Sequence, residues 1–300
     1  MREELFKNCT LCPRKCNVNR LEGKRGYCGM DSTIRAARAA LHMWEEPCIS
    51  GKKGSGAVFF SGCGLRCCFC QNRDIAIGDS GKEISVERLA EIFLELQEKG
   101  AANLNLVTGA HYVPHIISAL ELARGKGMNL PVVYNSSGYE SVETIRRLDG
   151  YVDVYLPDMK YMEPELAAAF SNARDYPQAA QSAIAEMMRQ TGPCQFVEDG
   201  YIKRGTIVRH LILPGHTKNS IAVLKYLYRT YGEDIFISVM NQYTPVWKNE
   251  KFPELNRKVT RREYEKVLDA AIELGIENGY FQEGETAEES FIPAFDYEGV

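Results

Sequence analysis

Short apolar runs alternate with amphipathic segments through most of the chain that follows residue 51. The runs are rich in β-branched residues and are separated by polar or turn-forming residues. This pattern is typical of strands that are buried on both faces of a parallel sheet. We predict such strands at residues 57–61, 103–107, 131–135, 152–156, 207–213 and 235–240.

The segments between these strands carry apolar residues at helical spacing. The clearest example ends before Gly100, and its apolar face consists of Leu89, Ile92, Phe93 and Leu96. Strands that alternate with helices predict an α/β fold in which right-handed crossovers join parallel strands. About six strand–helix units are too few for an eight-stranded barrel. We therefore expect an open or partly closed sheet that binds its ligand at the carboxyl ends of the strands.

The first 50 residues lack this rhythm and are rich in Cys, Arg, Lys and Gly. We predict a small Cys-rich module over residues 1–50 and an α/β domain over residues 51–300. The formal net charge of -4 gives no reason to expect nucleic acid or an anionic membrane as a partner. No apolar run approaches the roughly 20 residues of a membrane-spanning helix, and residues 1–4 do not resemble a signal peptide. We expect a soluble, cytoplasmic protein.

Ten cysteines in a long chain of this kind indicate metal or redox chemistry. Cys63, Cys67 and Cys70 form a C-x3-C-x2-C motif directly after the first predicted strand. Three thiolates on a tight loop can bind three irons of a cubane cluster and leave the fourth iron open to a substrate. We expect Cys68 to pack instead, because adjacent residues on a tight loop rarely point toward the same cluster. The alternative is a zinc knuckle, although zinc prefers four ligands, usually in two C-x2-C pairs.

A second group of cysteines lies near the N-terminus. Cys9, Cys12, Cys16 and Cys28 form a C-x2-C-x3-C-x11-C pattern. Four thiolates satisfy either tetrahedral zinc or a closed [4Fe–4S] cluster. Metal binding would explain how a short segment with few apolar residues folds. We expect a structural metal site of open identity, and the alternative is four free thiols in a disordered tail.

The first cysteine motif, with Phe69 before its last cysteine, resembles the signature of the radical S-adenosylmethionine (SAM) superfamily. Residues 70–74, 158–160 and 209–215 resemble segments of its pyruvate formate-lyase activating enzyme group. The resemblance covers residues 51–295 and implies a partial (β/α)6 barrel. The N-terminal cysteine pattern, together with residues 26–29, His42, residues 45–47 and residues 50–51, is similar to that of an uncharacterised branch, whose members are usually named only as activating-enzyme homologues.

The resemblance implies a [4Fe–4S] cluster on Cys63, Cys67 and Cys70 that cleaves SAM reductively to a 5′-deoxyadenosyl radical. It places Phe69 near the adenine and Arg209 opposite the SAM carboxylate. The other SAM-binding residues that it implies are Gly109, Asn135, Ser136, Asp158 and Lys160.

The implied partners are an electron donor such as flavodoxin or ferredoxin and a glycyl radical enzyme that the protein activates. The alternatives are radical modification of a peptide, a small molecule or RNA, and a zinc-binding module without catalysis.

The chain departs from the superfamily after the second predicted strand. Members often carry Gly-Gly-Glu-Pro there, and residues 108–112 read Thr-Gly-Ala-His-Tyr instead. Gly109 retains the capacity for close backbone approach, but no Glu is present to contact the SAM amino group. His111 has two interpretations, a side chain that reaches the site or a satisfied loop histidine.

Overall fold

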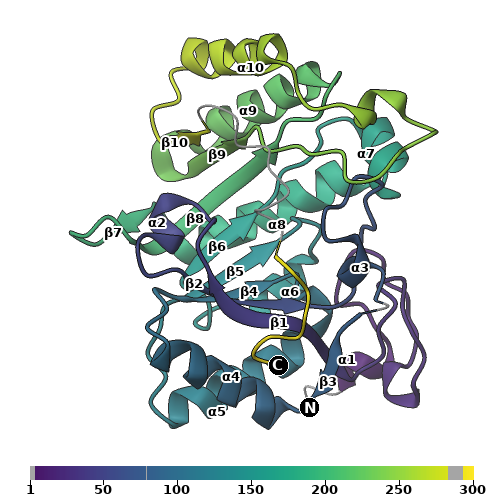
Figure 1. Ribbon diagram of the computed structural model, residues 1–300, viewed down its shortest axis with the longest axis vertical. Helices are drawn as coiled ribbons and strands as arrows, with labels where there is room; N and C mark the ends of the chain where they lie inside the picture. The colour runs from purple at the N-terminus through teal and green to yellow at the C-terminus, as the bar shows by residue number, and fades with distance from the viewer. Residues whose placement is uncertain (1–3, 79, 283–292) are drawn as a thin grey trace.

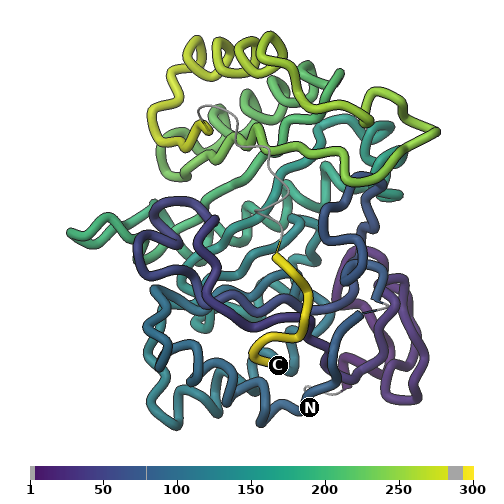
Figure 2. Tube along the Cα trace, viewed as in Figure 1, coloured from purple at the N-terminus to yellow at the C-terminus, as the bar shows by residue number. Residues whose placement is uncertain are grey.

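The computed structural model describes residues 4–78, 80–282 and 293–300, and Figures 1 and 2 show the path of the chain. One twisted sheet forms its centre, with the longer helices packed around it. The strands are β1 (Ile34–His42), β2 (Ser55–Phe60), β3 (Lys82–Ile84), β4 (Leu104–Val107), β5 (Val132–Ser136), β6 (Val154–Pro157), β7 (Gln195–Phe196), β8 (Ile202–Leu211), β9 (Phe236–Met240) and β10 (Gly279–Phe281).

The helices lie mainly between the parallel strands, as crossovers require. They are α1 (Glu4–Lys7), α2 (Pro47–Ser50), α3 (Arg73–Ala76), α4 (Val86–Glu98), α5 (Val113–Gly125), α6 (Val142–Arg147), α7 (Pro164–Ser171), α8 (Tyr176–Thr191), α9 (Thr217–Tyr231) and α10 (Arg261–Leu274). Short 3-10 helices occupy Arg20–Glu22, Ala110–Tyr112, Gly232–Asp234 and Pro253–Asn256. No helix in the described part of the chain is long and apolar enough to cross a membrane.

The strand order is β10-β9-β8-β6-β5-β4-β2-β1-β3, with β7 paired to β8. All pairs from β2 to β10 along this order are parallel, whereas β1 and β3 extend the sheet in antiparallel fashion. The first and last strands of this order, β10 and β3, are not paired with each other. The predicted α/β fold with a mainly parallel, incompletely closed sheet is therefore confirmed. The six predicted strands correspond to β2, β4, β5, β6, β8 and β9.

Strand β1 shows where the pattern misled us. The apolar pattern predicts no strand before residue 51, whereas Ile34–His42 forms a strand that pairs with β2 along most of its length. The strand is rich in alanine, which is depleted in strands, and Arg35 and Arg38 interrupt its apolar run. The sheet overrides this local preference by burying the alanines, while both arginines pair with acids, Arg35 with Glu83 and Arg38 with Asp296.

The two faces of the sheet have different neighbours. Val132, Tyr134 and Tyr155 belong to an apolar cluster with α4, α5 and α8. Alternate residues along the same strands, such as Val133 and Val154, belong instead to a cluster with α2. We call the second surface the inner face. The short segment around α2 covers part of it, which brings residues from the N-terminal part of the chain into the interior of the curved sheet.

Candidate active site

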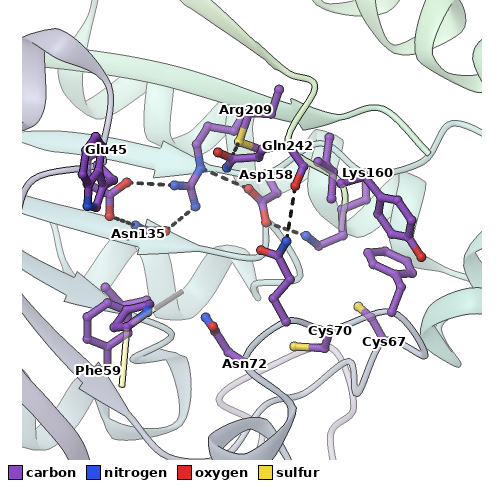
Figure 3. A pocket seen from close by; sticks show the side chains of 18 of the residues that line it. Glu45, Phe59, Cys67, Cys70, Asn72, Asn135, Asp158, Lys160, Arg209 and Gln242 are labelled. Carbon is purple, nitrogen blue, oxygen red and sulfur yellow. Dashed lines mark hydrogen bonds and ion pairs between the residues drawn. The ribbon is translucent and has the colours of Figure 1, made fainter. Parts of the chain in front are cut away.

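A cavity of about 230 Å³ opens on the inner face at the carboxyl ends of the parallel strands (Figure 3). Asn135 of β5, Asp158 after β6 and Arg209 of β8 line it together with Cys67 and Cys70. Their positions follow from the two-residue period of a strand, because Asn135 is on the face of Val133 and Arg209 on the face of Ile207. The cavity therefore lies at the carboxyl ends of the strands, where the strand pattern predicts that a ligand binds.

The cysteine loop begins with a sharp turn after β2. Gly62 has φ of 92°, and a Cβ atom there would lie 2.4 Å from Met30 Cγ and 2.9 Å from the Cys28 carbonyl oxygen. Glycine is therefore required at this turn. Farther along, Arg66 has φ of 57°, and Cys70 N donates to the Cys67 carbonyl oxygen at 3.2 Å. These turns fold the loop tightly against the end of the sheet.

The three cysteines of the motif lie close together on this loop. Cys67 and Cys70 face the cavity, and the Cys63 thiol is near enough to both to raise the pKa of each. Burial is the main cause, and it raises the pKa of Cys67 to about 11. Ser171 Oγ donates to Cys67 Sγ at 2.9 Å. Three free thiols on one sheltered loop beside a polar cavity fit a cubane with one open iron.

Cys68 has different surroundings, although it adjoins Cys67 in sequence. Its backbone N–H donates to the Phe170 carbonyl oxygen at 2.8 Å. Burial raises the pKa of the Cys68 thiol, and a hydrogen bond with Asn249 opposes this rise. Among the described residues, the lining of the cavity includes Cys67 and Cys70 but not Cys68. Its neighbours are thus Phe170 and Asn249, and its role as a packing residue stays a prediction.

A network of four charged groups forms the wall opposite the cysteines (Figure 3). Lys160 Nζ lies 2.5 Å from Asp158 Oδ2, and Arg209 Nε lies 3.2 Å from Asp158 Oδ1. Arg209 also reaches Glu45 Oε2 at 3.1 Å and Asn135 Oδ1 at 2.6 Å. The two acids and two bases are all largely buried, so each depends on the others for charge compensation.

The network controls the ionisation of its own members. Burial acts to raise the pKa of Asp158, but the nearby Lys160 and Arg209 outweigh it and lower that pKa. Burial likewise acts to lower the pKa of Lys160, and Asp158 and the Cys67 thiol raise it overall. Asp158 therefore stays anionic and Lys160 cationic near neutral pH. The cavity presents fixed charges of both signs, which suits a zwitterionic ligand.

Glu45 is the main residue of this site to which the sequence analysis assigned no role. It precedes α2, and its carboxylate accepts hydrogen bonds from Asn105 Nδ2 at 3.0 Å and from Asn135 Nδ2 at 3.2 Å. It thus joins two strands of the sheet to Arg209. The one available signal was the acidic pair Glu45-Glu46 before Pro47.

Five of the seven predicted SAM-binding residues line the cavity, and two do not. Asn135, Asp158 and Arg209 are described above, and the other two that line it are Phe69 and Lys160. Phe69 lines it and makes edge contacts with Phe170 and Tyr243, at ring-centroid distances of 6.3 Å and 6.2 Å. Lys160 lines it as well. Among the described residues, Cys63, Gly109 and Ser136 are not part of the lining.

Residues 108–112, which stand where superfamily members often have Gly-Gly-Glu-Pro, pack against neighbouring parts of the protein. A Cβ atom at Gly109 would lie 2.6 Å from Ile116 Cδ1, so this glycine allows close packing of α5. His111 is buried, and its Nε2 lies 2.7 Å from the Ser61 carbonyl oxygen. Burial, together with the nearby Arg20 cation, lowers the pKa of His111 to about 3. Of the two interpretations, the structure favours the satisfied loop histidine.

Ser136 points away from the cavity because it follows Asn135 on a strand, so its side chain is on the opposite face. Its hydroxyl accepts a hydrogen bond from Gly138 N at 3.0 Å and also lies beside Glu140. Tyr134 Oη donates to Glu140 Oε2 at 3.4 Å. Burial raises the pKa of Glu140 to about 8, although these hydrogen bonds oppose the rise.

Replacing Glu140 with Gln should change how stability depends on pH. Between about pH 4.5 and 8 the unfolded chain ionises this carboxyl and the folded protein does not, so stability falls as the pH rises. Glu140→Gln should therefore gain stability relative to the wild type as the pH rises from 5 to 8. Unfolding midpoints of both proteins at each pH test this. A constant difference between the two proteins would contradict the raised pKa.

The sequence of this chain is similar to a family model and to two curated proteins. Residues 57–227 match the family model of the Radical SAM superfamily. The chain is 30% identical over 276 residues to an uncharacterized protein of Methanocaldococcus jannaschii, with 90% of this chain and 75% of that protein covered. It is 27% identical over 113 residues to the pyruvate formate-lyase-activating enzyme of Clostridium pasteurianum, with 36% of this chain and 46% of that enzyme covered.

Among solved structures, the chain is similar to HydG, a maturase of the [FeFe]-hydrogenase. The TM-score is 0.51 and the identity is 15%, with 79% of this chain and 54% of the maturase covered. The chain thus spans about half of the length of that protein. At this identity the similarity concerns the fold, which has the same α/β architecture.

Proposed function

Because the chain belongs to the radical SAM superfamily, we propose that its cavity holds SAM against a [4Fe–4S] cluster bound by Cys63, Cys67 and Cys70. The observation that carries this proposal is the single cavity that joins the cysteine loop to the buried charges of Asp158 and Arg209. When bound, the cluster supplies one electron that cleaves SAM into methionine and a 5′-deoxyadenosyl radical, which takes a hydrogen atom from the substrate.

The residues of the cavity orient SAM and keep water away from it. Lys160 donates one of its three N–H groups to Asp158, which leaves two free for a ligand. Because Lys160 also lies near Cys67, it can bind the SAM carboxylate beside the cluster. Arg209 uses three of its five N–H donors on Asp158, Glu45 and Asn135. It therefore holds the two carboxylates in place and adds positive charge opposite the same ligand group.

The carboxylates serve the opposite end of the amino-acid group. Asp158 stays anionic and reaches the cavity from the end of β6. We assign Asp158 to bind the SAM ammonium group. Superfamily members often use a Glu after the second predicted strand for this contact, and this chain has no Glu there. Phe69 offers an aromatic face for the adenine from the cysteine loop itself.

For the substrate, we propose a glycyl radical enzyme that this protein activates with electrons from flavodoxin or ferredoxin in the cytoplasm. The similarity to the activating enzyme of Clostridium pasteurianum supports this choice. In the same proposal, the N-terminal cysteines Cys9, Cys12, Cys16 and Cys28 bind a second metal. Modification of a peptide, a small molecule or RNA is the alternative outcome of the test below.

The cofactor assignment is tested by anaerobic purification and reconstitution with iron and sulfide. The protein should be brown and should release 5′-deoxyadenosine from SAM when dithionite is added. A colourless zinc protein that leaves SAM intact would overturn the assignment.

The substrate assignment needs a separate experiment. Candidate glycyl radical enzymes labelled with deuterium at glycine should transfer the label to 5′-deoxyadenosine during turnover. A glycine radical signal in electron paramagnetic resonance (EPR) should appear in parallel. Label transfer from a peptide, a small molecule or RNA instead, with none from glycine, would replace the activase assignment.

A further inference from the structure

The four N-terminal cysteines gather in one place, although nothing in the radical chemistry above requires them. Cys9 and Cys28 are buried at 7% exposure each. Backbone hydrogen bonds fold the segment on itself, because Asn17 N donates to the Cys9 carbonyl oxygen at 3.0 Å and Lys15 N to the Cys12 carbonyl oxygen at 3.1 Å.

The backbone is shaped around these sulfur atoms. A Cβ atom at Gly26 would lie 3.4 Å from Cys16 Sγ and 3.8 Å from Cys28 Sγ, so Gly26 makes room between the two thiols. Tyr27 N donates to Cys16 Sγ at 3.2 Å. Lys15 and Asn17 on either side of Cys16 have φ of 42° and 55°. Backbone N–H groups that point at sulfur stabilise a metal-bound thiolate.

A buried cation, Arg20, lies beside this group of thiols. Arg20 is 0% exposed, and its guanidinium donates to the Asp31 and His111 carbonyl oxygens and, at 3.9 Å, toward Cys9 Sγ. In the described part of the chain, no carboxylate forms an ion pair with Arg20. A buried charge is costly unless an opposite charge compensates it. Metal-bound thiolates at Cys9 and its neighbours would supply that negative charge.

This group of cysteines is packed directly against the first cysteine loop. Cys12 Sγ would lie 3.7 Å from a Cβ atom at Gly64, the residue after Cys63. Arg14 Nε donates to the Gly64 carbonyl oxygen at 2.8 Å, and its guanidinium stacks on Tyr27 at 4.0 Å from the ring centroid. The segment is therefore ordered against the active site and is not a disordered tail.

The arrangement favours a cluster over a single zinc ion. Structural zinc usually takes its four cysteines as two C-x2-C pairs. Here Cys9, Cys12 and Cys16 follow one another closely and Cys28 alone is distant in the sequence. Cubane clusters take their ligands in this way, with three closely spaced cysteines and a fourth from elsewhere in the chain. The spacing C-x2-C-x3-C is also the first motif, C-x3-C-x2-C, in reverse order.

We infer that Cys9, Cys12, Cys16 and Cys28 hold a second [4Fe–4S] cluster, closed by four protein thiolates and packed beside the loop of the first. This inference deepens the proposed function and rests on its assignment of a metal to these cysteines. Because each iron has a cysteine ligand, this cluster has no open position for SAM. It differs in that respect from a cluster on Cys63, Cys67 and Cys70.

Two variants of the full chain separate the two clusters. The first is Cys63→Ala/Cys67→Ala/Cys70→Ala, and the second is Cys12→Ala/Cys28→Ala. After anaerobic reconstitution, the wild type should contain about eight irons per chain and each variant about four. SAM should alter the EPR spectrum of the reduced second variant and leave that of the reduced first variant unchanged. Cys48→Ala/Cys194→Ala, which changes cysteines outside both groups, should keep about eight irons.

The first variant decides the inference even when the second fails to fold. About one zinc per chain, no metal, or a disulfide in place of iron in that variant would overturn it. Failure of the proposed function has a different signature. In that case the first variant keeps its iron, while the wild type and the second variant show no response to SAM.

Discussion

Replacing Cys63, Cys67 or Cys70 singly with Ala should abolish reductive cleavage of SAM. Each thiolate holds a different iron, and the structure places the three on one tight loop with Cys67 and Cys70 at the wall of the cavity. Because the loop offers no further cysteine directed to the cavity, a lost ligand has no substitute. The yield of 5′-deoxyadenosine from SAM and dithionite should fall by at least about a thousandfold, as expected when a group that makes the chemistry possible is removed.

Cys68→Ala is the matched control, because it removes a thiol from the same loop. Cys68 packs near Phe170 and Asn249, so its replacement should leave SAM cleavage largely intact. If Cys68→Ala were as inactive as the other three, the ligand assignment would be wrong. Iron content should separate loss of the cluster from loss of folding, since Cys68→Ala should keep the iron of the wild type.

The periodicity of apolar residues was sufficient for the parallel part of the fold. Strands such as β4 and β5 are short, mostly apolar and buried on both faces, so local pattern and tertiary position agree. Strand β1 could not be predicted, because its local sequence pattern and its tertiary position disagree. Its alanines carry little strand preference, and it joins the sheet because pairing with β2 buries them. The stabilisation from this pairing depends on residues that are distant in the sequence, so a local pattern cannot reveal it.

The residues of the site likewise fall into some that the strand pattern could predict and some that it could not. Residues at the ends of predicted strands could be placed from the sequence, and Asn135, Asp158 and Arg209 do line one cavity. The two-residue period also could have excluded Ser136, which follows Asn135 and faces the other side. Glu45 could not be found by such reasoning. It enters the inner face from a loop before α2, and only the folded sheet brings it to Arg209.

Arg209→Ala should weaken both SAM binding and the fold. For a lost charge-assisted contact we expect about 2 kcal/mol, or roughly a thirtyfold higher dissociation constant for SAM. The substitution also leaves Glu45 and Asp158 buried with Lys160 as their main counter-charge. Breaking a buried ion pair from one side costs about 3–5 kcal/mol of stability. Equilibrium binding of SAM and unfolding midpoints measure the two effects.

The pH dependence of the stability loss in Arg209→Ala tests whether the buried acids cause that loss. In the wild type the pKa of Asp158 is lowered, so the stability that its charge contributes is present at neutral pH and is lost as the pH falls through that pKa. In Arg209→Ala the acids are destabilised most when ionised. The difference in stability between the two proteins should therefore be largest near pH 7 and should narrow as the pH falls below about 3.8, the ordinary pKa of an Asp carboxyl.

Arg261→Ala provides the control for charge removal alone. Arg261 is 91% exposed and pairs with Glu265 on the surface of α10, so its loss should change stability by less than about 0.5 kcal/mol and leave SAM affinity unchanged. Arg209→Lys should restore part of the stability but less of the affinity, because a lysine cannot reach Glu45, Asp158 and Asn135 together. Unchanged SAM affinity in Arg209→Ala would remove this residue from the binding site, whereas the buried network would still account for a stability loss.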